Sequence, residues 1–148
     1  MRSYWDTTRV GWMIIAAMFA VAIVEWPLAP SSIPAHWNLR GSIDGFGSRF
    51  RGLLLLPLSA GLRWGLITAR ALFQRGKFDA PVRRALVRLG YALLVIFIAV
   101  FSDLLFWING VTLNIHYFLL PAMLLMCAAL GNLPPAHVPG RRRGPMPG

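Results

Sequence analysis

The stretch LGYALLVIFIAVFSDLLFWIN at residues 89–109 decides the fold class of this chain. A helix of about 20 mainly apolar residues crosses the roughly 30 Å of hydrocarbon in a membrane, and this stretch has that length and character. Three more stretches share it, at residues 11–28, 53–73 and 111–130. We therefore expect an all-α integral membrane protein. It would have four transmembrane helices and an ordered extracytoplasmic loop, at about residues 29–52, between the first two helices.

The composition supports this class. The chain has 148 residues, of which 57% are hydrophobic and 14% charged, whereas soluble domains average about 45–50% apolar and about 25% charged residues. The formal net charge is +10, but the basic residues separate apolar runs instead of lining a soluble face, so nucleic acid is not an expected partner. With one cysteine, Cys127, the chain has no intrachain disulfide and no cysteine metal cluster. We expect no cofactor and no metal.

The distribution of Lys and Arg predicts the orientation. With four spans, the two termini and the second loop share one side, which carries 11 of the basic residues, and the other side carries 3. Cytoplasmic loops of membrane proteins are enriched in Lys and Arg, so both termini are expected in the cytoplasm. The first span also resembles a signal peptide, but no clear small-x-small cleavage site follows it.

Two further features concern the chain's organisation. The connection around Asn109 and Gly110 is very short, which predicts a tight antiparallel hairpin of the third and fourth spans. We expect residues 1–133 to form the transmembrane domain. Residues 134–148 are rich in Pro, Gly and Arg and are expected to be disordered. Their arginines either contact anionic headgroups or serve only to set the topology.

The first loop carries the one distinctive motif. Prolines such as Pro34 restrict its backbone, and glycines such as Gly41 permit tight turns. Asp44 and Gly45 form a typical turn dipeptide. Apolar residues spread through the loop, including Ile33, can bury against the membrane surface. We expect a compact, rigid loop.

This motif resembles the signature of the SdpI-type family of bacterial membrane proteins, mainly over residues 25–57. The matching residues are Ile33, Pro34, His36, Trp37, Asn38, Gly41, Asp44, Gly45, Phe46, Gly47, Arg49 and Pro57. The resemblance implies a multi-pass protein of the bacterial inner membrane and of the immunity type. The family's namesake protects a bacterium from its own secreted toxin and can sequester a transcriptional repressor at the membrane. Many relatives that carry only the first-loop domain have no assigned activity.

The loop is the expected binding site. Two interpretations of its polar side chains stay open: His36, Asn38 and Asp44 hold a divalent ion, or they brace the loop. In the favoured brace, Asp44 caps a turn, Asn38 satisfies backbone groups and His36 forms a hydrogen bond across the loop. The predicted binding residues are Pro34, His36, Trp37, Asn38, Gly41, Asp44 and Gly45.

A second candidate site lies inside the membrane, where Arg63, Asp103 and His116 interrupt apolar spans. Intramembrane charges cost roughly 2.5–3.5 kcal/mol each on insertion scales and usually pair. At about 1.5 Å per residue, Arg63 lies about 15 Å, Asp103 about 9 Å and His116 about 8 Å from the outer ends of their spans. Either Arg63 pairs with Asp103, or it extends alone toward the surface.

Three functions fit these features. The first is a non-enzymatic binding or immunity module, whose outer loop recognises a peptide, toxin or lipid. The second is an accessory subunit of a larger membrane complex. The third is a small enzyme or transporter that uses the intramembrane cluster. The few acids are scattered and no nucleotide-binding loop is present, so we do not expect an enzyme. The expected partners are membrane lipid and a protein or peptide at the outer face.

Overall fold

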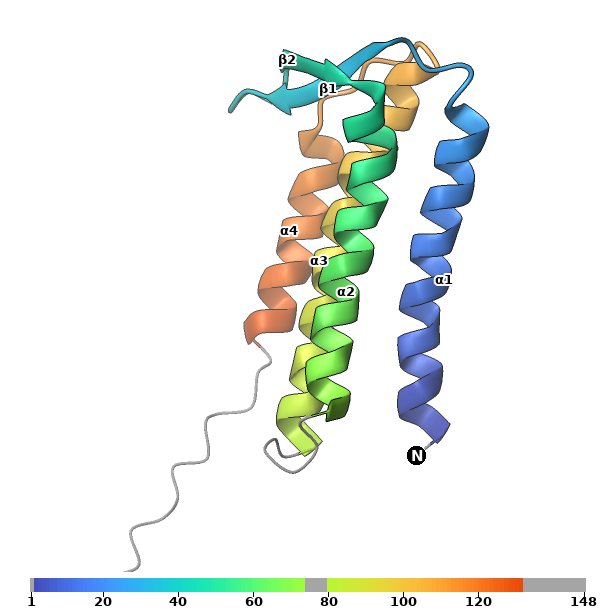
Figure 1. Cartoon of the computed structure of the whole chain (residues 1–148). Helices are drawn as coiled ribbons and strands as arrows, with labels where there is room; N and C mark the ends of the chain where they lie inside the picture. The colour runs from blue at the N-terminus through green and yellow to red at the C-terminus, as the bar shows by residue number, and fades with distance from the viewer. Residues whose placement is uncertain (1, 74–79, 132–148) are drawn as a thin grey trace, which may run out of the picture.

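The computed structural model describes residues 2–73 and 80–131, which form four helices and one β-hairpin (Figure 1). The helices are α1 (Arg2–Glu25), α2 (Leu56–Phe73), α3 (Ala80–Ile108) and α4 (His116–Gly131), and a π-helical segment η1 (Phe50–Leu55) leads into α2. The helices run along a common axis, and the hairpin lies across the end of the bundle opposite the N-terminus. The mostly helical fold expected from the sequence is confirmed.

Three helical stretches of the described chain are long and apolar enough to cross a membrane: Thr8–Glu25, Phe50–Ala71 and Val82–Ile108. They correspond to the first three predicted spans. The fourth helix, α4, has 16 residues and is therefore about 24 Å long, less than the roughly 30 Å of hydrocarbon. The fourth span stays a prediction. Residues 134–148, predicted to form a disordered tail, lie outside the described residues.

The connection between α3 and α4 is longer than the predicted tight turn. It spans residues 109–115, and a Schellman motif at its start ends α3. Gly110 has φ +81, its N–H donates to Trp107 O, and Val111 N–H donates to Phe106 O. Asn114 then starts α4 by accepting a hydrogen bond from His116 N–H at 3.0 Å. The helix thus begins five residues later than the predicted Val111.

The hairpin is the main departure from an all-α fold. Strand β1 (Ser32–Trp37) pairs antiparallel with β2 (Ile43–Ser48). The turn between them is built on Asn38, whose Oδ1 accepts hydrogen bonds from Arg40 N–H and Ser42 N–H at 2.9 and 3.1 Å. The prediction that Asp44 and Gly45 form the turn is wrong. Both lie in β2, because the side chain of Asn38 closes the turn earlier.

The apolar core has two parts. At the hairpin end, Ile33 of β1 is fully buried among residues of η1, α1 and α3, which include Leu53, Phe101 and Leu104. Further along the bundle, Trp64 of α2 is the largest buried side chain. The core thus joins α1, α2 and α3 along their length and attaches the hairpin to them.

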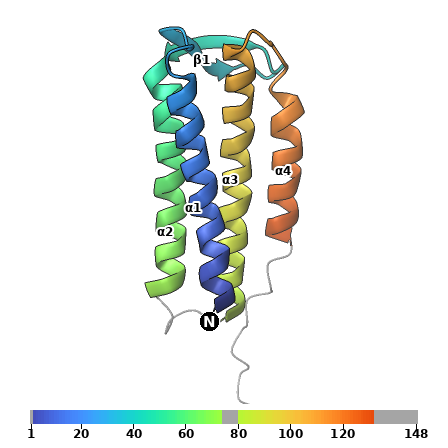
Figure 2. The same ribbon diagram turned by 90° about the vertical axis from the view of Figure 1, so that its right-hand side faces the viewer.

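Helix α3 is central, since it contacts α1, α2 and α4. Among the described helices, α4 contacts only α3. Figure 2 shows this arrangement: α4 lies beside α3, away from α1 and α2.

Candidate functional site: the hairpin and the membrane face

The hairpin is held firmly on the bundle. Pro34, next to Ile33, is also fully buried. On the other side, the α3–α4 connection holds the turn: Asn114 Nδ2 donates to Arg40 O at 2.8 Å, and Ile115 N–H donates to Gly41 O. The hairpin is therefore fixed both to the core and to the α3–α4 connection.

Arg49, the basic residue of the motif, braces the end of β2 against the end of α1. Its guanidinium lies 4.9 Å from the centre of the Trp26 ring, a cation–π contact. Its Nη1 donates to Ala29 O at 3.2 Å and more weakly to Trp26 O at 3.5 Å. These contacts close the segment between α1 and the hairpin, so the arginine has a structural role here.

His36 and Asp44 form a pair across the two strands. His36 Nδ1 lies 2.5 Å from Asp44 Oδ1, and the two side chains are 72% and 40% exposed. Gly45 is the strand partner of His36 and makes space for its side chain, because a Cβ at Gly45 would lie only 2.9 Å from His36 Cβ. The cross-loop hydrogen bond of His36 is confirmed, and so is the role of Asn38 in satisfying backbone groups. Asp44 does not cap a turn.

No metal site is apparent in the described chain. Within residues 2–73 and 80–131, no group of three or more His, Cys, Asp or Glu side chains lies close enough to hold an ion. The His36–Asp44 pair uses one ring nitrogen and leaves Nε2 at the surface for a hydrogen bond. Chemically, the pair can therefore donate or accept hydrogen bonds at the surface.

Trp37, the last residue of β1, is half-buried. Its Nε1 is buried and lies beside the Asp103 carboxylate, without the geometry of a full hydrogen bond. Asp103 is only 3% exposed. This carboxylate therefore lies beneath the hairpin, which links the loop motif to α3. Both residues were candidate site residues in the sequence, Trp37 in the loop motif and Asp103 in the intramembrane cluster. Their positions in the sequence gave no indication that they are in contact.

Exposed apolar side chains at the hairpin end were missed at the sequence level. Leu39 lies in the turn and is 98% exposed. Phe46 is 59% exposed and packs against Trp107, with ring centroids 5.9 Å apart. The only sequence signal was a leucine between Asn38 and Gly41, two residues that favour turns. The hairpin thus presents an apolar tip next to a polar pair.

The predicted intramembrane cluster is spread out. Arg63 is exposed on α2, Asp103 is buried beneath the hairpin, and His116 is half-buried at the start of α4. In the part of the chain that the structure describes, no ion pair joins Arg63 to Asp103. The physical reason is the helix period: Arg63 precedes the buried Trp64 and so points about 100° away from the core direction.

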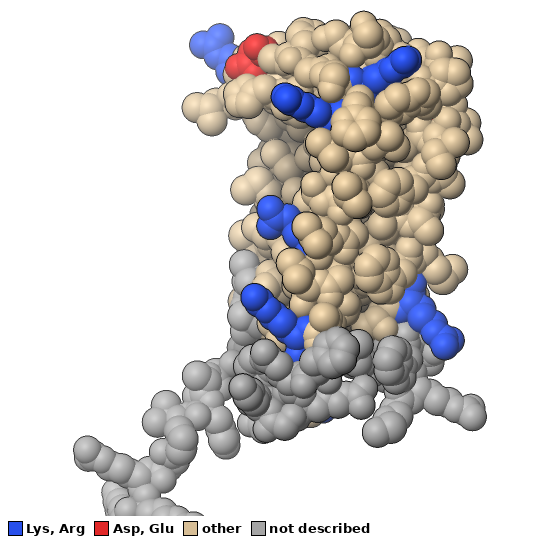
Figure 3. Space-filling view, viewed as in Figure 1, with Lys and Arg blue, Asp and Glu red and all other residues tan. Residues whose placement is uncertain are grey.

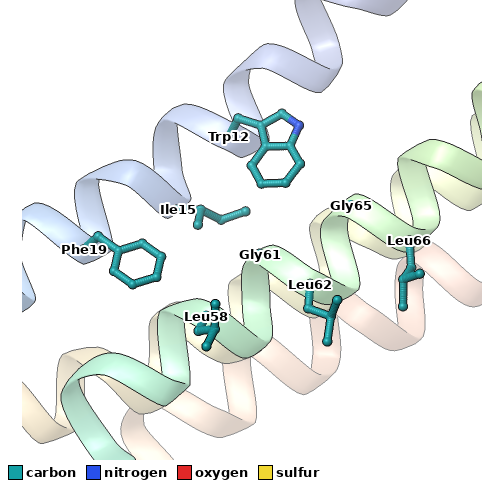
Figure 4. Close-up of a pocket in the computed structure, with 8 residues that line it drawn as sticks. All are labelled: Trp12, Ile15, Phe19, Leu58, Gly61, Leu62, Gly65 and Leu66. Atoms are coloured by element: carbon teal, nitrogen blue, oxygen red, sulfur yellow. The ribbon is translucent and has the colours of Figure 1, made fainter. Parts of the chain in front are cut away.

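An apolar groove of about 400 Å³ lies between α1 and α2 (Figure 4). Trp12 and Ile15 of α1 face Gly61 and Gly65 of α2, whose missing side chains open the groove. The other lining residues are Phe19, Leu58, Leu62 and Leu66. A smaller hollow of about 270 Å³ lies on α3, next to Ser102, Leu105, Phe106 and Asn109.

The charges on the face seen in Figure 3 lie mainly at the two ends. Basic side chains lie toward both ends and also at mid-height, and an acidic area lies at the hairpin end. The region between the ends is mostly free of charged side chains on this face, which fits the three candidate membrane spans.

Comparison with known proteins gives a family match over a part of the chain that includes the hairpin. The chain matches no curated protein and no solved structure. Residues 13–60 match the model of a family described only as a domain of unknown function, DUF1648. The matched segment contains most of α1, the whole hairpin, η1 and the start of α2.

Proposed function

We propose that this chain is a small bacterial inner-membrane protein that binds a peptide or toxin through its hairpin. In this proposal both termini are cytoplasmic, the hairpin is extracytoplasmic and α4 is the fourth span. The excess of Lys and Arg at the termini and the second loop supports the orientation. The resemblance of the loop to the SdpI-type family supports a non-enzymatic role of the immunity type.

The observation that carries the proposal is the surface of the hairpin. Leu39 is almost fully exposed, although buried groups and the α3–α4 connection hold the turn that carries it. An apolar side chain on a turn with a fixed backbone, carried by the same hairpin as the hydrogen-bonding pair His36 and Asp44, suits recognition, because little backbone entropy is lost on binding. Membrane lipid contacts the spans, and the peptide or toxin would contact this tip.

Gene deletion in the encoding bacterium tests the proposal. The deletion strain should become sensitive to culture supernatant from its own parent, and the wild-type gene should restore growth. The Leu39→Ser variant should fail to protect. Loss of a central contact costs about 2 kcal/mol or more, or roughly 30-fold in affinity.

Leu28→Ser is the matched control, since Leu28 is also exposed, at 65%, but lies outside the hairpin. It should protect like the wild type at equal membrane abundance. A deletion strain as resistant as its parent to every supernatant fraction would contradict the immunity role.

The alternative is an accessory subunit of a larger membrane complex. The exposed Arg63 in the middle of α2 favours it, because a lipid-facing cation at that depth is costly. Native mass analysis after gentle detergent extraction separates the two proposals. A stable hetero-complex supports the subunit, and a monomer or homodimer with protective activity supports the immunity role.

A further inference from the structure

Arg63 holds an unusual position on the membrane face of the bundle. It lies ten residues before Phe73, the last residue of α2, or about 15 Å along the axis. Its side chain is exposed. Cα–Cβ bonds in a helix tilt toward its N-terminus, so the Arg63 side chain leaves the backbone in the direction away from the nearer, C-terminal end of α2. Within residues 2–73 and 80–131 it forms no ion pair.

The acidic residues of the chain do not complement this charge. Asp44 contacts His36, Glu25 accepts a hydrogen bond from Asn109 at 3.3 Å, and Asp103 is buried beneath the hairpin. Of the other two acids, Asp6 lies near the start of α1, and Asp79 lies outside the described residues. A second copy would therefore bring another Arg63 to this depth, but no exposed carboxylate from the described spans.

The surface beside Arg63 has the shape of a docking face. Leu58, Leu62 and Leu66 follow one another at intervals of four residues and are 55%, 65% and 54% exposed. Such spacing forms a ridge along α2, and the ridge borders the groove toward α1 (Figure 4). Gly61 and Gly65 let α1 pack closely, since a Cβ at either position would lie 3.4 Å from Ile15 or Trp12, and these two α1 side chains line the groove beside the ridge.

We propose that this face binds a transmembrane helix of a different protein, one that carries an Asp or Glu near the middle of its span. The helix packs along the leucine ridge into the groove, and its carboxylate pairs with Arg63. A pair of opposite charges in the membrane offsets part of the cost that each alone would carry. The inference gives the accessory-subunit alternative a partner chemistry and does not depend on what the hairpin binds.

Model helices in vesicles provide the test. The full-length protein is labelled with a fluorescent donor at Ser42→Cys in a Cys127→Ser background and placed in phosphatidylcholine vesicles. The acceptor-labelled peptides are leucine-rich helices of about 20 residues. One has a central Asp, one has Leu there, and one has the Asp near an end. The central-Asp peptide should associate about tenfold more strongly than the all-Leu peptide.

Substitutions on the same face of α2 test which side chains cause the preference for the central-Asp peptide. Arg63→Leu should abolish the preference for Asp, and Arg63→Lys should keep most of it. Arg70→Leu is the matched control, because Arg70 is also exposed on α2 but lies near its end; the preference should not change. Leu62→Trp should weaken both peptides by obstructing the ridge.

Several results would overturn the inference. Equal binding of the central-Asp and all-Leu peptides would mean that lipid headgroups satisfy Arg63. Arg63-dependent association of two labelled copies would make a second copy the occupant. Wild-type binding by Leu62→Trp would place the peptide elsewhere. The Arg63→Leu strain is also tested in the supernatant assay, where unchanged protection separates this face from the role of the hairpin.

Discussion

At the scale of single residues, Gly41 connects the hairpin turn to the rest of the molecule. Its φ is +80, a conformation that side chains with a Cβ rarely adopt. A Cβ at this position would also overlap the side-chain amide of Asn114. That amide holds both Arg40 O and the first turn of α4. Gly41 therefore has two roles: it allows the backbone conformation of the turn, and it leaves space for the Asn114 side chain that holds the turn.

Gly110 offers a matched comparison, because its φ is +81 and nothing lies within 4 Å of a Cβ built there. Both Gly41→Ala and Gly110→Ala should lower the free energy of unfolding by about 1–2 kcal/mol, because alanine is strained in the left-handed backbone conformation. Gly41→Ala should lower the free energy of unfolding by about a further 1–2 kcal/mol, because it also displaces Asn114 from its hydrogen bonds. Equilibrium unfolding in detergent measures both. Equal losses would show that the Asn114 contact contributes nothing.

At the scale of the helices, Trp64 determines how α1, α2 and α3 pack. It is 1% exposed, and its ring lies 4.7 Å from that of Tyr91, centroid to centroid. Gly11 of α1 and Gly90 of α3 leave the space that its indole fills. The indole N–H has no partner in the described chain, so packing alone holds the ring.

This packing predicts opposite effects at two glycines. A Cβ at Gly90 would lie 2.8 Å from Trp64 Cζ3, so Gly90→Ala should overpack the site and destabilise the bundle by about 1–3 kcal/mol. A Cβ at Gly65 would meet Trp12 at an ordinary 3.4 Å. Gly65→Ala should be neutral or stabilising by up to about 1 kcal/mol, since Ala favours helix.

Thermal unfolding in the same detergent compares these variants. The smaller ring in a Gly90→Ala/Trp64→Phe double variant should restore part of the loss. A double variant that loses the sum of the two single effects would argue against the contact.

At the scale of the whole molecule, the hairpin and the N-terminus lie at opposite ends of the bundle. The hairpin and the C-terminal end of α2 at Phe73 would therefore lie on different sides of a membrane that the bundle crosses. The count of basic residues predicts which side is cytoplasmic.

Cysteine labelling in intact cells measures the orientation. In a Cys127→Ser background, Ser42→Cys should react with an impermeant maleimide, because the hairpin faces outward. Gly76→Cys should react only after the cells are opened. The reverse pattern would invert the proposed topology and place the hairpin in the cytoplasm.

The sequence alone was sufficient for the features that one segment carries by itself. Apolar length predicted the spans at residues 11–28, 53–73 and 89–109, because the transfer of a helix into lipid depends on summed hydrophobicity and needs no neighbour. The loop motif likewise marked the hairpin region. Of its polar contacts, the roles of Asn38 and His36 were predicted, since these bonds join residues close in the chain.

Features that depend on distant residues became apparent only in the folded chain. Asn114 meets the turn from 74 residues away, and Trp37 lies beside Asp103. Neither the β-hairpin nor the late start of α4 follows from hydropathy, because local hydrogen bonds at Asn38, Gly110 and Asn114 determine where strands and helices end. Arg63 faces outward for a similar reason: its neighbour Trp64 fills the space between two glycines on other helices. Side-chain direction is decided by such packing, and a linear sequence does not display it.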